Sequence, residues 1–440
     1  MAYTNKQILQ ITFPVLISLL MEHLIGLTDT AYLGRVGEVE LGASALAGVY
    51  YLVIYMLGFG FSIGAQVLIA RRNGEREYGR IGEVFTQGTL FLLLLAALLF
   101  LFSRLYTPVV LGGLIGSERV MQAAVSYMDW RAYGFFFSFI AVMFRAFYVG
   151  TTNTKILTAN SVVMVFTNII LNYLLIFGRC GLPAMGIAGA GLASSISEAV
   201  SVLFFVGYTW LKVDHRRYGL FRFTRIDFRM LKQILSVSVW VMVQHGIAFC
   251  GWFIFFIAVE HLGERPLAIT NIVRSISAFL FMFVNAFAST NSSLVSNLIG
   301  AGQSDAVLPL CRRMIRLCYA FVLPLGLLLA LFPSLVVRIY TDDPGLVAAC
   351  IPSLWVLLSS YLVAVPAFIF FFSVSGTGNT RMALLIDMVS ILVYVLYTLW
   401  IVRVMRADIA VCWTTEYVYS LMILSSFFYL WKGNWRSKRI

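Results

Sequence analysis

The chain is a succession of apolar segments, each about as long as a bilayer is thick, and this pattern restricts the fold more than any other feature. Runs of about 18 or more apolar residues recur from one end to the other, separated by short polar stretches. Hydrophobic residues make up 60% of the 440 residues, and charged residues only 12%. Because a helix satisfies its own backbone hydrogen bonds inside lipid, the pattern predicts an all-α polytopic membrane protein.

At about 20 residues per span, the apolar segments predict twelve transmembrane helices. We expect them at 8–33, 44–70, 84–106, 123–149, 157–178, 187–211, 233–259, 267–298, 314–337, 347–374, 382–402 and 409–431. An even number of spans places both termini on one side of the membrane. The loops on that side carry most of the Lys and Arg residues, so the positive-inside rule predicts cytoplasmic termini and a multi-pass protein of the cell (inner or plasma) membrane.

The two halves of the chain share short segments at an offset of 226 residues. The matches are GTTNTK at 150–155 with GTGNTR at 376–381, Gly74 with Gly300, and Gly37-Glu38 with Gly263-Glu264. Each match alone is ordinary helix-turn-helix chemistry, since Gly ends a helix and Asn or Thr caps the next one. Three matches at one offset indicate a duplication, and six spans per repeat predict two six-helix lobes related by a pseudo-two-fold axis along the membrane normal.

The repeat also predicts the domain organisation. We expect an N-terminal lobe at 1–211, a basic cytoplasmic linker at 212–232, which is the longest and most basic connection, and a C-terminal lobe at 233–440. An alternating-access carrier binds its substrate in a cavity between two such halves.

Charge and cysteine content exclude several classes of function. The net charge of +12 resides mostly in short connections next to helix ends, where it sets topology and meets lipid headgroups, so we expect membrane lipid and no nucleic acid as a partner. The six cysteines and four histidines are scattered, without a zinc or disulfide pattern. HExxH, nucleophile-elbow and P-loop motifs are absent from the sequence, so we predict neither an enzyme nor a cofactor.

Two acids in the first span need an explanation. An isolated charge at the bilayer centre costs roughly 2.5–3.5 kcal/mol on insertion scales, so an acid there needs a partner, a wet cavity or a proton. Glu22 and Asp29 are seven residues apart and share one helix face. Either this face lines a cavity in which at least one acid binds a coupling cation, or Asp29 is an interfacial group five residues before Gly34. The residues alone leave the two interpretations nearly even.

Spans five and six carry polar pairs at helical spacing. Asn168 and Asn172 are four residues apart, and such amides serve most often as interhelical hydrogen-bonding groups, although their carbonyl oxygens also suit a hard cation. Ser194 and Glu198 are again four apart, so we expect a hydroxyl and an acid to join the same cluster.

Three further acids lie within predicted spans. For Asp129, which is close to Arg131, and for Glu416 we favour structural pairing. Asp387 has an interfacial or a binding role, and the sequence leaves both open.

These segments together resemble the multidrug and toxic compound extrusion (MATE) transporters. The resemblance rests on FPVLISLL and DTAYLGR in the first span, GFSIGAQVLIARRNGERE closing the second, GTTNTK before the fifth, and AGAGLAS in the sixth. It covers nearly the whole chain. It implies export of organic, often cationic and amphipathic compounds in exchange for entering H+ or Na+.

The resemblance also assigns roles to residues. Asp29 matches the family's acid in span one, Pro14 the proline at which that helix bends, Asn168 and Asn172 the polar pair of span five, and Ser194 a position commonly occupied by Thr. The implied coupling-ion residues are Asp29, Asn168, Asn172 and Ser194, with Glu22 and Glu198 as further cavity acids. The resemblance therefore favours the functional interpretation of Asp29.

The chain departs from the family pattern in two places. Span seven offers only Gln244 and His245 where some members carry a second essential acid, and the repeat places Phe255 opposite Asp29. We therefore expect coupling in the N-terminal lobe alone. Asn at position 172, where some members have Asp, removes one charge and puts Na+ binding in doubt.

We therefore expect a monomeric secondary active exporter of small organic cations, driven by antiport of H+ or Na+ and without any other cofactor or metal. The alternative is a flippase for lipid-linked precursors, which shares the two-lobe plan. A flippase for an anionic lipid phosphate should line its cavity with basic residues. Only Arg131, Arg145 and Arg274 are candidates, and we expect all three near span ends, which argues against this alternative.

Overall fold

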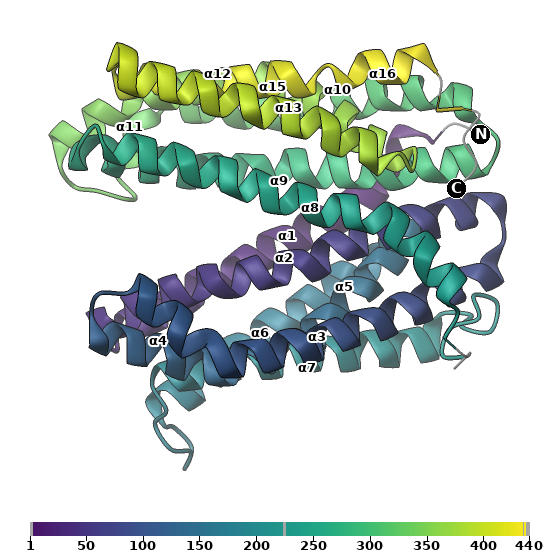
Figure 1. The fold of residues 1–440 in the computed structure, drawn as a ribbon, viewed down its shortest axis with the longest axis horizontal. Coiled ribbons are helices and arrows are strands. Elements are labelled where there is room, and N and C mark those ends of the chain that lie inside the picture. Colours follow the sequence, from purple (N-terminus) through teal and green to yellow (C-terminus); the bar gives the residue numbers. More distant parts are fainter. Residues whose placement is uncertain (1–2, 223–225, 434, 437–440) are drawn as a thin grey trace. The chain divides into compact units, whose positions relative to one another are not determined.

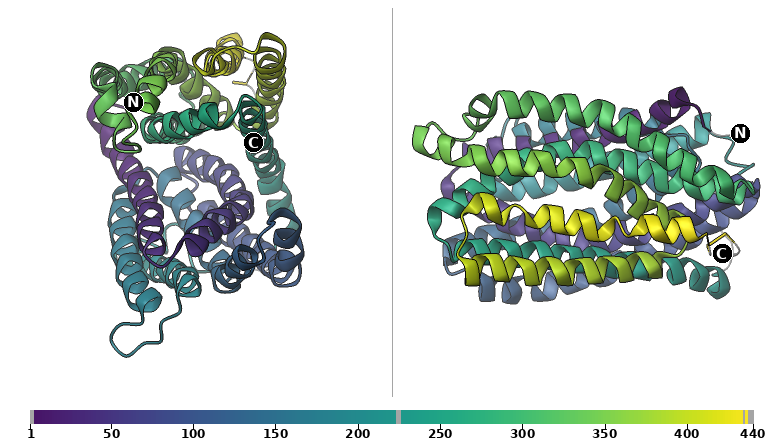
Figure 2. Two further views of the ribbon diagram at one scale, coloured as in Figure 1. Left: turned by 90° about the vertical axis from the view of Figure 1, so that its left-hand side faces the viewer. Right: turned by 90° about the horizontal axis from the view of Figure 1, so that it is seen from above.

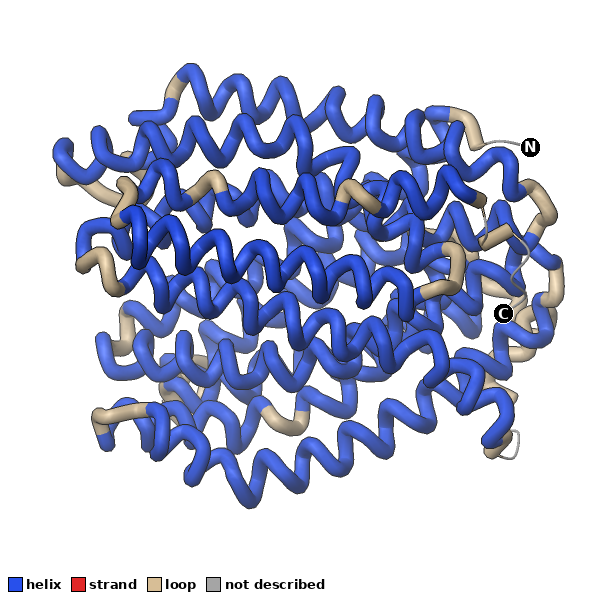
Figure 3. The backbone as a smooth tube through the Cα atoms, turned by 45° about the horizontal axis from the view of Figure 1, so that its top comes forward, coloured by secondary structure: helices blue, strands red, loops and turns tan. Residues whose placement is uncertain are grey.

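The structure, a computed structural model, describes residues 3–222, 226–433 and 435–436, and every regular element in these ranges is helical (Figures 1 and 3). The helices are α1 (Asn5–Gly34), α2 (Glu38–Glu75), α3 (Tyr78–Leu114), α4 (Glu118–Arg131), α5 (Gly134–Gly150), α6 (Lys155–Phe177), α7 (Ile187–Lys212), α8 (Phe228–Glu260), α9 (Glu264–Gly300), the short η1 (Ser304–Ala306), α10 (Val307–Leu331), α11 (Pro333–Val337), α12 (Pro344–Gly376), α13 (Thr380–Leu399), the π-helical η2 (Trp400–Met405), α14 (Ile409–Cys412), α15 (Thr415–Ile423) and α16 (Ser426–Lys432). Residues 223–225 of the predicted linker lie outside the described residues.

The helices agree with the predicted spans. Ten helices of the described chain are long and apolar enough to cross a membrane, and α4 with α5 makes an eleventh that is bent by 54°. The last predicted span, 409–431, consists of the three short helices α14, α15 and α16. The chain is therefore an all-helical multi-pass membrane protein.

The span predicted at 123–149 consists of two helices, α4 and α5, which are bent by 54° relative to one another. Residues 118–150 contain no proline, so proline does not cause the break. A Cβ atom on Gly134 would lie 2.2 Å from Nη1 of Arg131 and 2.4 Å from Oε2 of Glu198. Two charged side chains thus occupy the space beside this glycine. Arg131 is the last residue of α4 and lies directly before the break in this bent pair.

The duplication is visible in the local structure. Gly37 precedes α2 and Gly263 precedes α9, at the offset that the sequence predicts. Gly150 ends α5, and a Cβ atom there would lie 3.1 Å from the carbonyl oxygen of Gln66. Gly376 ends α12, and a Cβ atom there would lie 2.4 Å from the carbonyl oxygen of Ser292. Since 66 and 292 also differ by 226, both halves use the same close helix contact.

The contacts divide the chain into two compact units, Phe13–Met242 and Met1–Thr12 with Val243–Ile440. Their boundaries differ from those of the predicted lobes. The start of α1 belongs to the unit of the second half, where Ile8 is fully buried in the core. The start of α8 belongs to the unit of the first half, where the Ser238 hydroxyl donates to the Phe61 carbonyl at 3.0 Å. Each repeat thus begins with a helix that is divided between the units.

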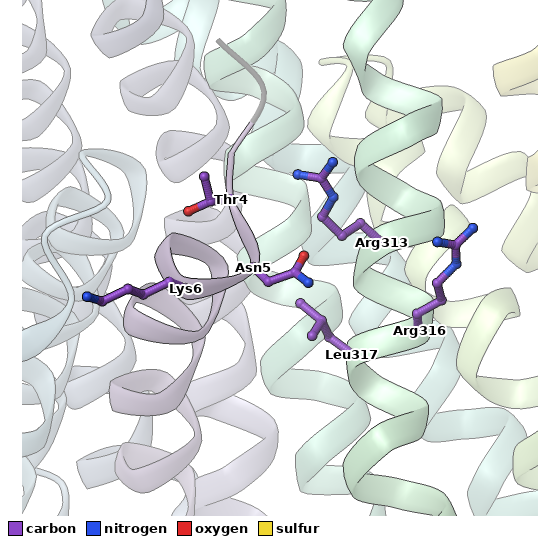
Figure 4. A pocket seen from close by; sticks show the side chains of 6 residues that line it. All are labelled: Thr4, Asn5, Lys6, Arg313, Arg316 and Leu317. Atoms are coloured by element: carbon purple, nitrogen blue, oxygen red, sulfur yellow. The ribbon is translucent and has the colours of Figure 1, made fainter.

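The start of α1 is held by α10. A guanidinium N–H of Arg313 donates to the carbonyl oxygen of Tyr3. The two segments border a pocket of about 650 Å³, in which Asn5 and Arg313 face one another while Lys6 and Arg316 point to opposite sides (Figure 4). Because the side chains of Lys6 and Arg316 do not converge on one point, we interpret the pocket as the place where the N-terminal segment packs against α10.

Two connections of the first unit differ in how they pack against its helices. Residues 178–186 between α6 and α7 project beyond the helices (Figure 2). The described start of the predicted linker packs on the unit: Leu220 is buried, and the ring of Tyr218 meets that of Phe147 edge-on at 5.3 Å. Burial raises the pKa of the Tyr218 phenol, which therefore stays neutral.

Candidate functional site

The acid of the first helix meets polar side chains of two other helices. Asn172 on α6 donates its amide to Oδ1 of Asp29 at 2.5 Å, and the Ser194 hydroxyl on α7 lies 3.5 Å from Oδ2. We call Asp29, Asn168, Asn172 and Ser194 the polar cluster. Asp29 thus faces two neighbouring helices, as expected if this face of α1 is polar and packed.

The two asparagines complete this cluster and are fully buried. Asn172 also donates to Oδ1 of Asn168 at 2.9 Å, and Asn168 donates to the Ser194 hydroxyl at 3.4 Å. Oδ1 of Asn172 is buried and has no hydrogen-bond partner among the described residues. A buried acceptor without a donor is costly, and a cation beside Asp29 would satisfy it.

The polar cluster combines side chains that suit a proton or a hard cation. It offers one carboxylate, two amide oxygens and a hydroxyl, all hard oxygen donors. Within the described residues, no three His, Cys, Asp or Glu side chains gather as they would around a metal ion of higher charge. The donors therefore fit a proton on Asp29 or a sodium ion among the oxygens.

A cavity of about 400 Å³ opens within the first unit. This volume suits a drug-sized molecule. The cavity is lined from α1, α2, α5, α6 and α7 and from the end of α4, by Ser18, Glu22, Ile25, Gly26, Gly48, Tyr51, Leu52, Tyr55, Arg131, Ser138, Ala141, Val142, Arg145, Leu157, Asn160, Ser161, Met164, Glu198, Ser201 and Phe205. Both further acids of the prediction, Glu22 and Glu198, are among these residues.

Each cavity acid forms an ion pair with an arginine. Arg131 binds Glu198 through two hydrogen bonds of 2.6 and 2.9 Å, and both side chains are buried. Arg145 donates to Glu22 at 3.1 Å, and the Glu22 side chain is 45% exposed. The cavity is therefore lined by two arginine–glutamate ion pairs. One pair is buried, and the other is partly exposed to solvent.

Tyrosine and other large side chains surround the buried pair. The guanidinium of Arg131 stacks 3.6 Å from the ring centre of Tyr51, whose hydroxyl donates to Glu198 at 3.2 Å. Tyr55, Met164 and Phe205 add aromatic and polarisable surface to the cavity. Such a wall accepts apolar parts of different shapes.

Two acids have partners other than the nearest residue in the sequence. We expect Glu198 to join Ser194 in the cluster of Asp29, but its carboxylate pairs with Arg131. Asp129 forms an ion pair, which agrees with the structural pairing expected for it, but its partner is Arg104 at 2.6 Å and not the nearby Arg131. In both cases the partner comes from another helix and not from the adjacent turn.

Pro14 lies inside α1, two residues after the division of the chain at Thr12. Its ring provides no N–H for the preceding helical turn. The Thr158 hydroxyl lies 3.5 Å from its carbonyl oxygen, so α6 supports this part of α1.

The acids of the second unit have a different setting. Asp387 on α13 is only 1% exposed and accepts from the Tyr419 hydroxyl at 2.9 Å. Glu416 is the second residue of α15 (Thr415–Ile423). Arg274 lies over the ring of Phe256 at 4.8 Å, in this second unit.

Sequence reasoning missed the roles of Arg131, Arg145 and Tyr51 in the cavity. A usable signal existed for the arginines. An arginine and a glutamate that each stand alone in apolar spans are expected to pair, because neither can remain charged and unpartnered in lipid.

Comparison with known proteins adds the family. The MatE family model matches residues 14–174 and 241–400, one range in each repeat. A "Probable multidrug resistance protein NorM" of Photorhabdus laumondii is 24% identical over 357 residues, which cover 80% of this chain and 77% of that protein.

Two solved structures show the same fold. The Vibrio cholerae MATE transporter VcmN in its bent form gives a TM-score of 0.88 at 18% identity, over 97% of this chain and 96% of that one. A MOP superfamily transporter from Pyrococcus furiosus, for which a reverse polarity of the binding pocket suggests a different function, gives 0.89 at 17% identity, over 97% and 95%. At these identities the likeness carries the fold alone.

Proposed function

Because the chain belongs to the MatE family of multidrug and toxic compound extrusion transporters, we propose that it exports small organic cations by antiport with H+ or Na+. Coupling resides in the first unit. No enzymatic step is part of this proposal, and the coupling ion is the only cofactor. Both termini lie in the cytoplasm and the chain works as a monomer in the cell membrane.

One observation carries the proposal: buried polar side chains of α6 and α7 contact the carboxylate of Asp29, and both helices also line a cavity. The 2.5 Å contact between Asn172 and Asp29 joins α1 to α6. α1, α6 and α7 each contribute to the cavity wall as well. A change of ion at Asp29 therefore acts on the helices that bind the substrate.

The membrane potential contributes to export only when the exchange moves net charge across the membrane. One positive charge that moves inward through a membrane potential of 100 mV releases about 2.3 kcal/mol. At 1.4 kcal/mol per factor of ten, this potential alone supports a concentration ratio of roughly 40 for a neutral solute. For a monocation in one-to-one exchange the charges cancel, and the chemical gradient of the ion drives export.

The test is transport in proteoliposomes with imposed H+ or Na+ gradients, with wild type and Asp29→Asn compared. We expect efflux of a fluorescent organic cation to follow one of the two gradients in the wild type and to ignore both in the variant. Undiminished gradient-driven efflux in Asp29→Asn would remove Asp29 from the mechanism. Asp29→Glu, which keeps the charge, is the matched control for the helix contacts.

One observation favours the alternative function of a lipid flippase: Arg131 and Arg145 line the cavity. Each of them is neutralised by a glutamate, which leaves little positive charge for an anionic lipid phosphate. The same liposomes distinguish the functions. Movement of a labelled polyprenyl pyrophosphate without movement of the cationic dye would replace antiport by lipid flipping.

A further inference from the structure

The cavity and the polar cluster are adjacent but separate. Among the described residues, the cavity lining includes Glu22 and Glu198 and not Asp29. The two sites share α7, where Ser194 contacts Asp29 and Glu198 lies one turn further along. A substrate in the cavity therefore does not displace an ion from Asp29 by taking its place, and antiport requires a group that both sites sense.

Arg131 is placed to be that group. Its side chain binds Glu198 in the cavity wall, at 2.6 and 2.9 Å. Its carbonyl oxygen lies 3.3 Å from the hydroxyl of Ser195, the neighbour of the serine that contacts Asp29.

Counting charges explains why the two cations would exclude each other. Two acids, Asp29 and Glu198, face three cations: Arg131, the coupling ion and the substrate. Two acids neutralise only two of the three. Because Arg131 is 8% exposed, leaving it unpaired is costly, so the third cation has to leave.

We propose that Arg131 is a positioning residue shared between two acids: it pairs with Glu198 while Asp29 holds its ion, and it releases Glu198 to a substrate cation once Asp29 is empty. This inference rests on the proposed function, for which it supplies the link between ion and substrate. Glu198 is then the carboxylate that receives the positive group of the substrate.

The second ion pair of the cavity provides a matched control. Arg145 and Glu22 line the same cavity and have the same chemistry. Glu22 is half-exposed, so water solvates its charge. Loss of its arginine partner therefore costs less free energy than loss of the partner of Glu198.

The experiment measures binding of ethidium, a fluorescent organic monocation, to purified full-length protein in lipid nanodiscs, with and without saturating coupling ion. In the wild type we expect the ion to raise the Kd of ethidium at least about fivefold, within the usual range of coupling between sites. In Arg131→Met the factor should fall below about twofold, and ethidium should bind more tightly without ion than in the wild type. Arg131→Lys keeps the charge and should restore part of the factor.

Arg131→Met leaves Glu198 buried and unpaired, and this variant alone could fail to fold. The double variant Arg131→Met with Glu198→Gln removes both charges and avoids this cost. We expect it to bind ethidium at least about fivefold more weakly than the wild type, with an ion factor below about twofold. The control pair, Arg145→Met with Glu22→Gln, should keep the wild-type ion factor.

The outcomes separate the inference from the function on which it rests. A wild-type ion factor in the folded double variant would overturn the role of Arg131, and unchanged ethidium affinity there would overturn the role of Glu198. Loss of the factor in the control pair as well would show a general effect of cavity charge and would also overturn the inference. A wild type that shows neither an ion factor nor gradient-driven efflux would instead overturn the proposed antiport.

Discussion

The same stretch of the repeat is a broken helix in one half and a continuous helix in the other. Residues 118–150 form α4 and α5 with a bend of 54°, whereas the equivalent residues, 344–376, form the single helix α12. The prolines favour the opposite result, because α12 contains Pro352 and Pro366 and the broken stretch contains none. The cause therefore lies in what packs against the helix.

The residues at the break show this cause. Arg131 and Glu198 correspond to Leu357 and Leu424, at the repeat offset of 226. Leu357 is 2% exposed and Leu424 packs on the hydrophobic core of the second unit. In the second half these two positions carry packed leucines. In the first half they carry an ion pair, whose atoms occupy the space that a side chain at position 134 would need.

The acid site follows the same division. Asp29 and Asn168 correspond to Phe255 and Tyr394, whose rings pack with centroids 6.2 Å apart. Phe255 is 1% exposed. The second half therefore has packed aromatic rings where the first half has an acid and an amide.

The largest expected effect comes from giving the first half the residues of the second. Arg131→Leu alone should lower the free energy of unfolding by about 3–5 kcal/mol, because Glu198 stays buried without a partner. Arg131→Leu with Glu198→Leu should be close to the wild type or up to about 4 kcal/mol more stable. Thermal or denaturant unfolding in detergent measures both. Equal destabilisation by the single and double variants would show that the pair is not what distinguishes the halves.

The acids of the two halves should differ nearly as much in transport. Asp29→Asn should reduce gradient-driven efflux by about 100-fold, near the upper end of typical coupling between sites. Asp387→Asn, the matched change of a buried acid in the second unit, should keep efflux within about twofold, since Tyr419 can still donate to an amide oxygen. Initial rates of gradient-driven efflux from proteoliposomes measure both effects. The reverse order would move coupling into the second unit.

The sequence predicts the helices well because burial in lipid imposes a strong and local pattern. The apolar runs, the repeat offset and the glycines at helix ends are all legible without a partner, and Gly37, Gly150, Gly263 and Gly376 lie where that pattern predicts. Asp29, Asn172 and Ser194 also meet as expected, because helical spacing and the family resemblance place them on facing helices.

The ion pairs could not be predicted from spacing. Glu198 and Arg131 are 67 residues apart, and Glu22 and Arg145 are 123 apart. Which acid meets which arginine depends on how the helices rotate and bend. The Arg131–Glu198 pair lies directly beside the bend at Gly134, so the pairing and the bend depend on the same helix arrangement.

Close helix contacts give a smaller difference between the halves. Gly376→Ala should cost about 1–3 kcal/mol of unfolding free energy, because the new Cβ meets backbone atoms of Ser292. Gly150→Ala should cost about half as much, since its nearest neighbour is a side-chain methyl of Ile69 at 2.8 Å. The same unfolding assay compares them. Equal losses of unfolding free energy would mean that α2 and α9 shift equally easily to make room for the new methyl group.

The smallest effect concerns the charge of the polar cluster. Asn172→Asp places a second carboxylate beside Asp29, and a site with two negative charges holds a cation more tightly. We expect Na+ to displace bound dye at a concentration about tenfold lower than in the wild type, because ligand charge is what most readily tunes such sites. Asn172→Leu removes the unpaired Oδ1 and should shift the Na+ dependence in the opposite direction. If both variants fold and titrate with Na+ as the wild type does, then the oxygens around Asp29 hold no sodium. The ion that Asp29 exchanges would in that case be the proton, which needs the carboxylate alone.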